Sequence, residues 1–362
     1  MRASIENVQV SAFRIPTDEP EGDGTLAWDS TTLVVVEVEA GGKRGLGWGY
    51  ADTATARLVA DRLADVVRGR DAFAVPATWA EMVRSIRNLG RPGIASMAIA
   101  CVDVALWDLE ARLLGLPLFV LLGTVRDAVP LYGSGGFTTL DEVRLAEQLG
   151  DWAAAGFGAV KMKVGTQPER DLDRVRHARV AIGRDVELFV DANGAYERKQ
   201  ALAFAERYAE LGVTWFEEPV SSDDLEGLRL LRDRAPAGMR IAAGEYGYDA
   251  PYFVRLLGAV DVLQADATRC AGITGFLRVA ALAEAHCIPL SAHTAPALHL
   301  HACCAAPGRL APLEWFHDHV RIEALAFDGV VRPAGGTLRP DPGAPGHGLT
   351  LRRADLARYE VA

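Results

Sequence analysis

The feature that most constrains the fold is a regular alternation of short apolar runs with longer amphipathic stretches, from about residue 129 to residue 316. Continuous apolar runs separated by helical patterns are typical of parallel strands that are buried on both faces. Eight such runs in succession predict an α/β protein whose strands form a (β/α) barrel. The predicted strands are Pro130–Ser134, Ala159–Val164, Glu187–Asp191, Thr214–Glu217, Arg240–Glu245, Val260–Asp266, Ile288–His293 and Leu313–Phe316.

Polar or titratable residues close most of these strands, at intervals of 21 to 28 residues, about the length of one βα unit. In a barrel, the carboxyl ends of the strands converge on one face, which is where active sites lie. We therefore expect these strand-end side chains to meet: Lys163, Asp191, Glu217, Glu245, Asp266, His293 and Glu314.

Residues 1–125, before the barrel, have the pattern of an α+β unit. Residues 126–320 are predicted to form the barrel. Residues 321–362 are predicted to form a tail that packs back on the first unit. A Gly-Gly-Lys turn at residues 41–43 predicts a hairpin. The polar stretch Asp18–Gly24 predicts a mobile loop. The expected strands are Ile5–Ile15, Thr31–Val38 and Gly45–Tyr50, and the expected helices are Ala54–Arg68, Ala77–Leu89 and Ile94–Leu114.

Charge and hydropathy exclude some classes of partner. The formal net charge of −10, without a basic run, argues against a nucleic-acid-binding protein. No run approaches membrane-spanning length, and the first residues lack the apolar core of a signal peptide, so we expect no membrane partner and a cytoplasmic location. The five cysteines are scattered without a CxxC pair, as expected for reduced thiols.

Three carboxylates, Asp191, Glu217 and Glu245, close successive predicted strands. Three negative charges crowd into a buried site only when a cation neutralises them, and a ligand set made only of oxygen favours Mg²⁺ or Mn²⁺ over zinc. A single such carboxylate is more often a helix cap or a surface group. The three together predict a metal site, with Mg²⁺ as the expected ion.

Lys161 and Lys163 lie two residues apart on one predicted strand, so their side chains share one side. An isolated pair of this kind is more often the solvated face of an edge strand. Two neighbouring ammonium groups disfavour each other's charge, which predicts a lowered pKa and suits a lysine that acts as a base.

Asp266 and His293 close the sixth and seventh predicted strands and form a candidate acid/base dyad. A neighbouring carboxylate fixes the tautomer of a histidine and raises its basicity. Glu314 would line the remaining wall, and its carboxylate-rich surroundings suggest that it could be protonated and donate a hydrogen bond. The other histidines of this region, His299, His301, His317 and His319, are interpreted as structural or surface residues.

The ordered set Lys161-Met162-Lys163, Asp191-Ala192-Asn193-Gly194, Glu217-Glu218-Pro219, Gly244-Glu245, Gln264-Ala265-Asp266 and His293 resembles the enolase superfamily, mandelate racemase subgroup. The resemblance spans essentially the whole chain. It implies a modified (β/α)₇β TIM barrel with an N-terminal α+β capping domain that is completed by the C-terminal tail. Loops of the cap, matching residues 18–29 and 48–53, would close over the substrate.

The resemblance also implies roles for these residues. Mg²⁺ would be held by Asp191, Glu217 and Glu245, one ion per site. Lys163 would be a base on one face and the His293–Asp266 dyad a base on the other, with Lys161 as the accessory lysine beside the substrate carboxylate. The residues expected to contact substrate are Glu314, Asn193, Trp28 and Tyr50. Members of the subgroup are usually homo-oligomers, so a dimer or octamer is expected.

Such a site predicts removal of the proton α to a carboxylate through an enediolate. The outcome stays open between dehydration of an acid sugar (an aldonate or aldarate) to a 2-keto-3-deoxy acid and racemisation or epimerisation of an α-substituted carboxylate. The polar, acidic stretch 18–29 and the hydroxyl-binding groups after Glu245 and Asp266 favour dehydration. A catalytically silent barrel that acts as a binding module is the alternative of another class, disfavoured by the intact set of acid, base and metal positions.

Overall fold

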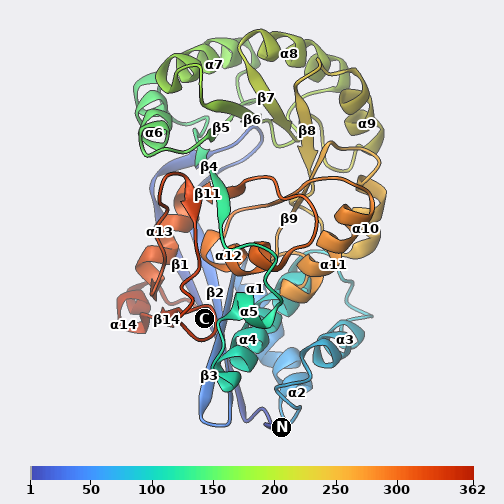
Figure 1. The fold of residues 1–362 in the computed structure, drawn as a ribbon, viewed down its shortest axis with the longest axis vertical. Helices are drawn as coiled ribbons and strands as arrows, with labels where there is room; N and C mark the ends of the chain where they lie inside the picture. Colours follow the sequence, from blue (N-terminus) through green and yellow to red (C-terminus); the bar gives the residue numbers. More distant parts are fainter. Residues whose placement is uncertain (1) are drawn as a thin grey trace.

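The computed structural model describes residues 2–362 and contains a curled parallel sheet of eight strands with helices outside it (Figure 1). The strands follow the order β10-β9-β8-β7-β6-β5-β4-β11. All eight predicted strands are confirmed, namely β4 (Val129–Gly135), β5 (Ala159–Lys163), β6 (Glu187–Asp191), β7 (Val213–Glu217), β8 (Arg240–Ala243), β9 (Val262–Ala265), β10 (Leu290–Ala292) and β11 (Leu313–Phe316).

The sheet closes into a barrel between β10 and β11. A parallel bridge joins Leu290 to Leu310, and Ser291 Oγ donates a 2.7 Å hydrogen bond to the carbonyl of Pro312. Seven helices lie between the eight strands, so the described chain has the predicted (β/α)₇β order. They are α6 (Glu142–Ala154), α7 (Pro168–Ile182), α8 (Arg198–Glu210), α9 (Leu225–Arg234), α10 (Ala250–Leu256), α11 (Gly272–Ala285) and α12 (Pro296–Ala305).

Large aromatic side chains fill the barrel beneath the strand ends. Phe189 and Trp215 stack with ring centroids 4.9 Å apart, and Tyr132 packs edge-on against Phe189 at 5.4 Å. All three are fully buried. These aromatic rings occupy the barrel interior. The polar side chains two residues further along the strands are therefore held at the carboxyl-terminal mouth of the barrel.

The N-terminal unit is an antiparallel sheet in the order β1-β2-β3, covered by helices. The predicted hairpin at residues 41–43 is confirmed, and one predicted helix, Ala54–Arg68, is interrupted by a π-helical turn. The elements are β1 (Asn7–Gly22), β2 (Ala27–Ala40), β3 (Lys43–Tyr50), α1 (Thr53–Leu58), the π-helical turn Val59–Leu63, α2 (Ala64–Val67), α3 (Val75–Ser85), α4 (Ile94–Leu114) and α5 (Leu118–Leu121).

The prediction of a mobile loop at Asp18–Gly24 is wrong for most of its length. Strand β1 continues to Gly22, and after a shift in register Glu21 lies opposite Trp28 on β2. The polar residues suggested a loop because one face of this extension is exposed, whereas Glu21 and Gly22 are buried. A single long hairpin therefore reaches from the cap to the barrel.

The last part of the chain returns to the cap. After α13 (His317–Ala326), β12 (Phe327–Asp328) pairs with β14 (Thr350–Leu351), β13 (Thr337–Leu338) pairs with β4, and α14 (Arg353–Leu356) leads to the C-terminus. The backbone N–H of Ala12 on β1 donates to the carbonyl of Ala362 at 2.6 Å, and that of Val361 donates to Ala12 at 2.8 Å. Within residues 2–362, none of the helices has both the length and the apolar character needed to cross a membrane.

The cap sheet packs on α4 without room for side chains on one face of β3. A Cβ atom added at Gly47 would lie 2.1 Å from the backbone oxygen of Cys101, a separation that forces the strand and helix apart. The backbone of α4 therefore sits directly on the glycines of β3.

We expect Gly47→Ala to destabilise the cap by about 1–3 kcal/mol, the usual cost of overpacking, and to lower the midpoint of thermal unfolding. Gly158→Ala is the matched control, because no atom lies within 4 Å of a Cβ added there and its φ is not in the left-handed region. Equal melting curves for the two variants, followed by circular dichroism, would contradict the close packing of α4 on β3.

Candidate active site

The structure brings the predicted strand-end residues together at one mouth of the barrel. Lys161 and Lys163 lie on β5, Asp191 ends β6, Glu217 ends β7, and Glu314 lies on β11. Glu245, Asp266 and His293 follow β8, β9 and β10 by one or two residues. All eight side chains are buried, with exposed fractions of 0–6%.

The backbone at this mouth is held in conformations that non-glycine residues rarely adopt. Asn193, Glu218 and Thr294 have φ values of 45°, 37° and 51°, each just after a strand that supplies a site residue. Such strain persists where the surrounding structure enforces it, and it clusters at functional sites. Gly244 before Glu245 is required, since its φ is 137° and a Cβ would lie 2.1 Å from the carbonyl oxygen of Gln264.

Asp191, Glu217 and Glu245 form a carboxylate triad. One oxygen from each lies within 4.8 Å of the others. Burial and the charge of Asp191 raise the pKa of Glu217 well above its ordinary value, as expected for crowded carboxylates. Glu245 has a buried oxygen, Oε2, with no hydrogen-bond partner among residues 2–362.

The triad fits a hard divalent cation. Its donors are all oxygens from rigid strand ends, they converge within one coordination sphere, and one of them has an unused lone pair in a buried position. A dication would also offset the repulsion that raises the pKa of Glu217. The residues present thus agree with the Mg²⁺ expected from the sequence.

Lys161 is fully buried among carboxylates. Its Nζ atom lies 2.5 Å from Glu217 Oε1, 2.8 Å from Glu314 Oε1 and 3.4 Å from Asp191 Oδ2. Although burial opposes its charge, these carboxylates raise the pKa of Lys161 well above its ordinary value. The lysine is therefore a fixed positive charge at the floor of the site.

Lys163 points to the same side of β5. Its Nζ donates to Asp191 Oδ2 at 2.5 Å and to Asn193 Oδ1 at 3.1 Å. The predicted lowering of the lysine pKa values is wrong for this structure. Burial and the charge of Lys161 both lower the pKa of Lys163, but Asp191 and the other carboxylates outweigh them and raise it above its ordinary value.

The suggestion that Glu314 is protonated is also wrong for this structure. Burial favours the neutral form, but the charges of Lys161 and His293 lower the pKa of Glu314 below its ordinary range. Its carboxylate accepts hydrogen bonds from Ser134 Oγ at 2.6 Å and from the Thr294 backbone N–H at 3.0 Å. Neighbouring cations and donors, which the sequence did not place, decide its charge.

The predicted dyad is present. His293 Nδ1 lies 2.9 Å from Asp266 Oδ2, and Asp266 Oδ1 accepts hydrogen bonds from the backbone and hydroxyl of Thr268, both at 2.7 Å. A hydrogen bond from Nδ1–H to this carboxylate leaves Nε2 as the free acceptor, 3.5 Å from Glu245 Oε2. His299 holds the adjacent turn, because its ring contacts the backbone of Ala267 and Thr294.

A cavity of about 410 Å³ lies over these groups, between the barrel mouth and the cap. Lys163, Asn193, Glu245, His293 and Glu314 line it from the barrel, whereas Lys161, Asp191, Glu217 and Asp266 are absent from its walls. The cap contributes Trp28 and Tyr50, the other two residues predicted to contact substrate. It also contributes Asp23 and Leu26, from the turn between β1 and β2.

The sequence analysis left several lining residues unassigned, among them Ser30, Thr31, Thr32, Thr294 and Phe316, and it interpreted one differently. His319, interpreted as structural or surface, lies in the cavity wall and stacks on the Tyr50 ring, with centroids 3.4 Å apart. No motif marked His319, because it stands in the first turn of α13 rather than at a strand end. Only the position of Tyr50, at the end of β3, shows that His319 belongs to the cavity wall.

Comparison with known proteins agrees with this architecture. Residues 14–123 match the family described as mandelate racemase / muconate lactonizing enzyme, N-terminal domain, and residues 144–355 match the family described as enolase C-terminal domain-like. A structure of a mandelate racemase/muconate lactonizing enzyme-like protein from Rubrobacter xylanophilus is 57% identical, with a TM-score of 0.97 over 99% of this chain and 100% of that one.

Two characterised relatives are similar over most of the chain. A 3,6-anhydro-alpha-L-galactonate cycloisomerase from Streptomyces coelicolor is 34% identical over 99% of both proteins. An L-talarate/galactarate dehydratase from Salmonella typhimurium is 32% identical over 90% of this chain and 85% of its own. The structure of that dehydratase liganded with Mg and L-lyxarohydroxamate has a TM-score of 0.91 at 28% identity, over 100% of this chain and 94% of that one.

We expect Glu245→Gln to weaken Mg²⁺ binding by at least about tenfold, since substitutions even outside the ligand shell commonly cost that much. Isothermal titration calorimetry measures the affinity directly. Glu187→Gln is the matched control, because Glu187 stands at the opposite, amino-terminal end of β6 and is exposed. Equal Mg²⁺ affinity in the two variants would show that the triad is not the magnesium site.

Proposed function

This chain belongs to the enolase superfamily, in its mandelate racemase subgroup, and on that premise we propose that it dehydrates an acid sugar, an aldonate or aldarate, to a 2-keto-3-deoxy acid. The observation that carries the proposal is the pairing of two acid/base groups, Lys163 and His293, in the wall of one polar cavity beside a carboxylate triad. Removal of the proton α to a carboxylate is the common first step.

Mg²⁺ held by Asp191, Glu217 and Glu245 would supply a Lewis acid that favours negative charge on the substrate carboxylate as the α-proton leaves. Lys161, fixed beneath the triad, adds a second positive charge that needs no reorganisation. Because its ammonium is buried and paired with two glutamates, we assign it electrostatic stabilisation rather than proton transfer.

Lys163 and His293 are the proton-transfer groups in this proposal. Lys163 lines the cavity from β5, and His293 lines it from the turn after β10. One of them removes the α-proton, according to the configuration of the α-carbon, and the other protonates the departing β-oxygen. The carboxylates that raise the pKa of Lys163 are the proposed Mg²⁺ ligands, so a bound dication would offset their charge and allow the lysine to act as a base. Asp266 orients the imidazole so that Nε2 is the reacting nitrogen.

The lining of the cavity supports a polyhydroxylated substrate. Hydroxyl, carboxylate and guanidinium groups outnumber apolar side chains there, and they come from both the cap and the barrel. Such groups recognise hydroxyl-rich ligands through directed hydrogen bonds. The polar residues that we expect to face substrate are Asp23, Ser30, Thr31, Thr32, Tyr246, Arg269 and Thr294.

A second candidate is cycloisomerisation, favoured by the relative that is 34% identical over the full chain. The chemistry begins in the same way, with loss of the α-proton and cleavage of a β-carbon–oxygen bond. If that oxygen belongs to a ring of the substrate, it remains attached and the product is an isomer; if it is a hydroxyl, water leaves. The same protein groups serve both outcomes.

The homo-oligomer, a dimer or octamer, and the cytoplasmic location expected from the sequence stay predictions. Light scattering after size-exclusion chromatography measures the assembly. The proposed partner is a small carboxylate rather than a macromolecule, in keeping with a cavity of about 410 Å³.

We expect ¹H NMR of an acid-sugar panel in D₂O, with Mg²⁺ and enzyme, to show a new deoxy-methylene signal and a product lighter by one water. An isomeric product without water loss would identify the cycloisomerase. Loss of the α-proton signal with all else intact would identify a racemase or epimerase and contradict the dehydration proposal. Turnover should cease when EDTA removes the metal.

We expect Lys163→Ala and His293→Asn each to lower kcat by about 10²–10⁴-fold, the usual contribution of general acid/base catalysis. One of the two variants should still exchange the substrate α-proton with deuterium, because it retains the base on the correct face. The exposed His177 provides the control, His177→Asn. Near-normal turnover in both active-site variants would refute the two-group mechanism.

A further inference from the structure

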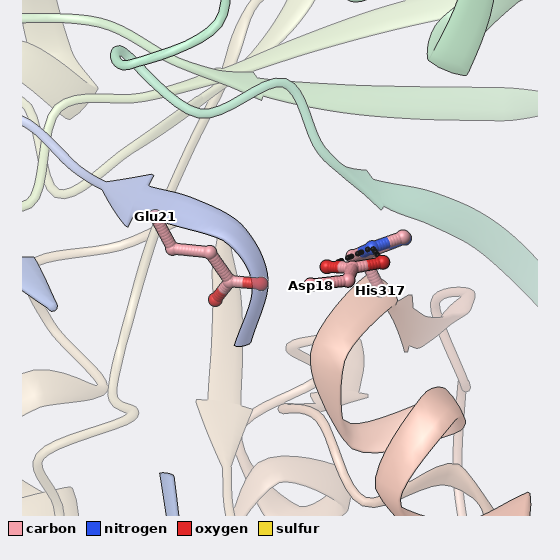
Figure 2. Close-up of side chains that lie close together, drawn as sticks. All are labelled: Asp18, Glu21 and His317. Atoms are coloured by element: carbon pink, nitrogen blue, oxygen red, sulfur yellow. Dashed lines mark hydrogen bonds and ion pairs between the residues drawn. The ribbon is translucent and has the colours of Figure 1, made fainter. Parts of the chain in front are cut away.

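A second cluster of metal-ligating side chains lies outside the catalytic mouth, where the long cap hairpin meets the barrel. Asp18 and Glu21 come from β1, and His317 is the first residue of α13 (Figure 2). One ligand atom from each of the three lies within 4.8 Å of the others. These residues are absent from the walls of the catalytic cavity, although Trp28 and Phe316 beside them line it.

Glu21 is the unusual member of the cluster. Its side chain is only 1% exposed, and its Oε1 atom has no hydrogen-bond partner in the part of the chain that the structure describes. Figure 2 shows its carboxylate extending from β1 toward Asp18 and His317. A buried carboxylate oxygen without a donor is costly, so native structures rarely keep one unless another group satisfies it.

The Glu21 carboxylate is satisfied on one side only. Trp28 Nε1 donates to Oε2 at 2.9 Å, whereas Oε1 is the unsatisfied oxygen. A ligand oxygen of Glu21 lies within 4.8 Å of ligand atoms of Asp18 and His317. A cation held by the three side chains would therefore compensate a buried carboxylate oxygen.

We propose that Asp18, Glu21 and His317 form a binding site for a Zn²⁺-type divalent cation that clamps the cap hairpin to the barrel. Zinc accepts both imidazole nitrogen and carboxylate oxygen as ligands, whereas Mg²⁺ prefers oxygen alone. A site with three protein ligands leaves the fourth position for water.

The geometry is close to what the ion needs. His317 Nε2 lies 2.9 Å from Asp18 Oδ2, near the separation of about 3.3 Å between ligands of a tetrahedral zinc with bonds of about 2.0–2.1 Å. Asp18 is exposed and free to adjust. Glu21 needs only a small movement, since its carboxylate already lies within the 4.8 Å cluster.

The test measures zinc bound per chain by the intact protein. The protein is equilibrated with micromolar Zn²⁺ in millimolar Mg²⁺, which occupies the catalytic triad, and then analysed by equilibrium dialysis and elemental analysis. We expect one Zn²⁺ per chain. Asp191→Asn should bind it equally well, which would place the ion outside the triad. The inference does not rest on the proposed activity, because no turnover is measured.

Variants of the cluster locate the ion. Glu21→Gln and His317→Gln should each weaken zinc binding by at least about tenfold. Glu19→Gln is the matched control. This substitution removes the same charge from the same strand, but the Glu19 carboxylate pairs with Arg144 rather than with the cluster. Circular dichroism without zinc should give similar spectra for all variants, so that loss of binding reports the ligands.

The proposal is overturned if the wild-type chain retains no zinc in excess Mg²⁺, or if zinc bound to the wild type is lost in Asp191→Asn but kept in Glu21→Gln. It is equally overturned if Glu19→Gln and Glu21→Gln bind zinc alike. A rise in the midpoint of thermal unfolding on adding Zn²⁺, present in the wild type and absent in His317→Gln, is the second expected result.

Discussion

The buried charge network at the barrel mouth is the constraint on which the rest of the structure depends. Lys161 is fully enclosed and contacts Asp191, Glu217 and Glu314 at once. Breaking such a network by removing one partner typically costs about 3–5 kcal/mol, because the remaining charge stays buried and uncompensated. The strand ends must therefore hold their register closely, and the aromatic packing of the barrel interior beneath them provides that rigidity.

The cap makes this network useful. A mouth open to water would screen the charges, whereas the hairpin of β1 and β2 reaches over it and walls the cavity with Trp28. Coulomb interactions strengthen as water is excluded, so the cap raises the effect of every fixed charge below it. The C-terminus of the chain also holds β1 in place, through the paired backbone hydrogen bonds between Ala12 and residues 361–362.

Much of the barrel and its site was predictable because both follow one-dimensional rules. Buried parallel strands give continuous apolar runs, and their polar ends must meet, so Asp191, Glu217 and His293 could be placed at one mouth of the barrel without coordinates. The charge states of Lys163 and Glu314 could not be predicted, since they depend on distances between strands. The extension of β1 was missed because its pairing with β2 overrode local polarity. The position of His319 was missed because it depends on Tyr50 of the cap, whose ring stacks on the imidazole.

The cap hairpin also connects the catalytic cavity to its own outer edge. Trp28 forms part of the cavity wall, and its indole nitrogen donates to Glu21. The ring packs edge-on against Phe137, which in turn contacts Phe316 and His317. One hydrogen bond and a series of aromatic contacts thus join the Asp18–Glu21–His317 cluster to the cavity wall, although Asp18, Glu21 and His317 do not themselves line the cavity.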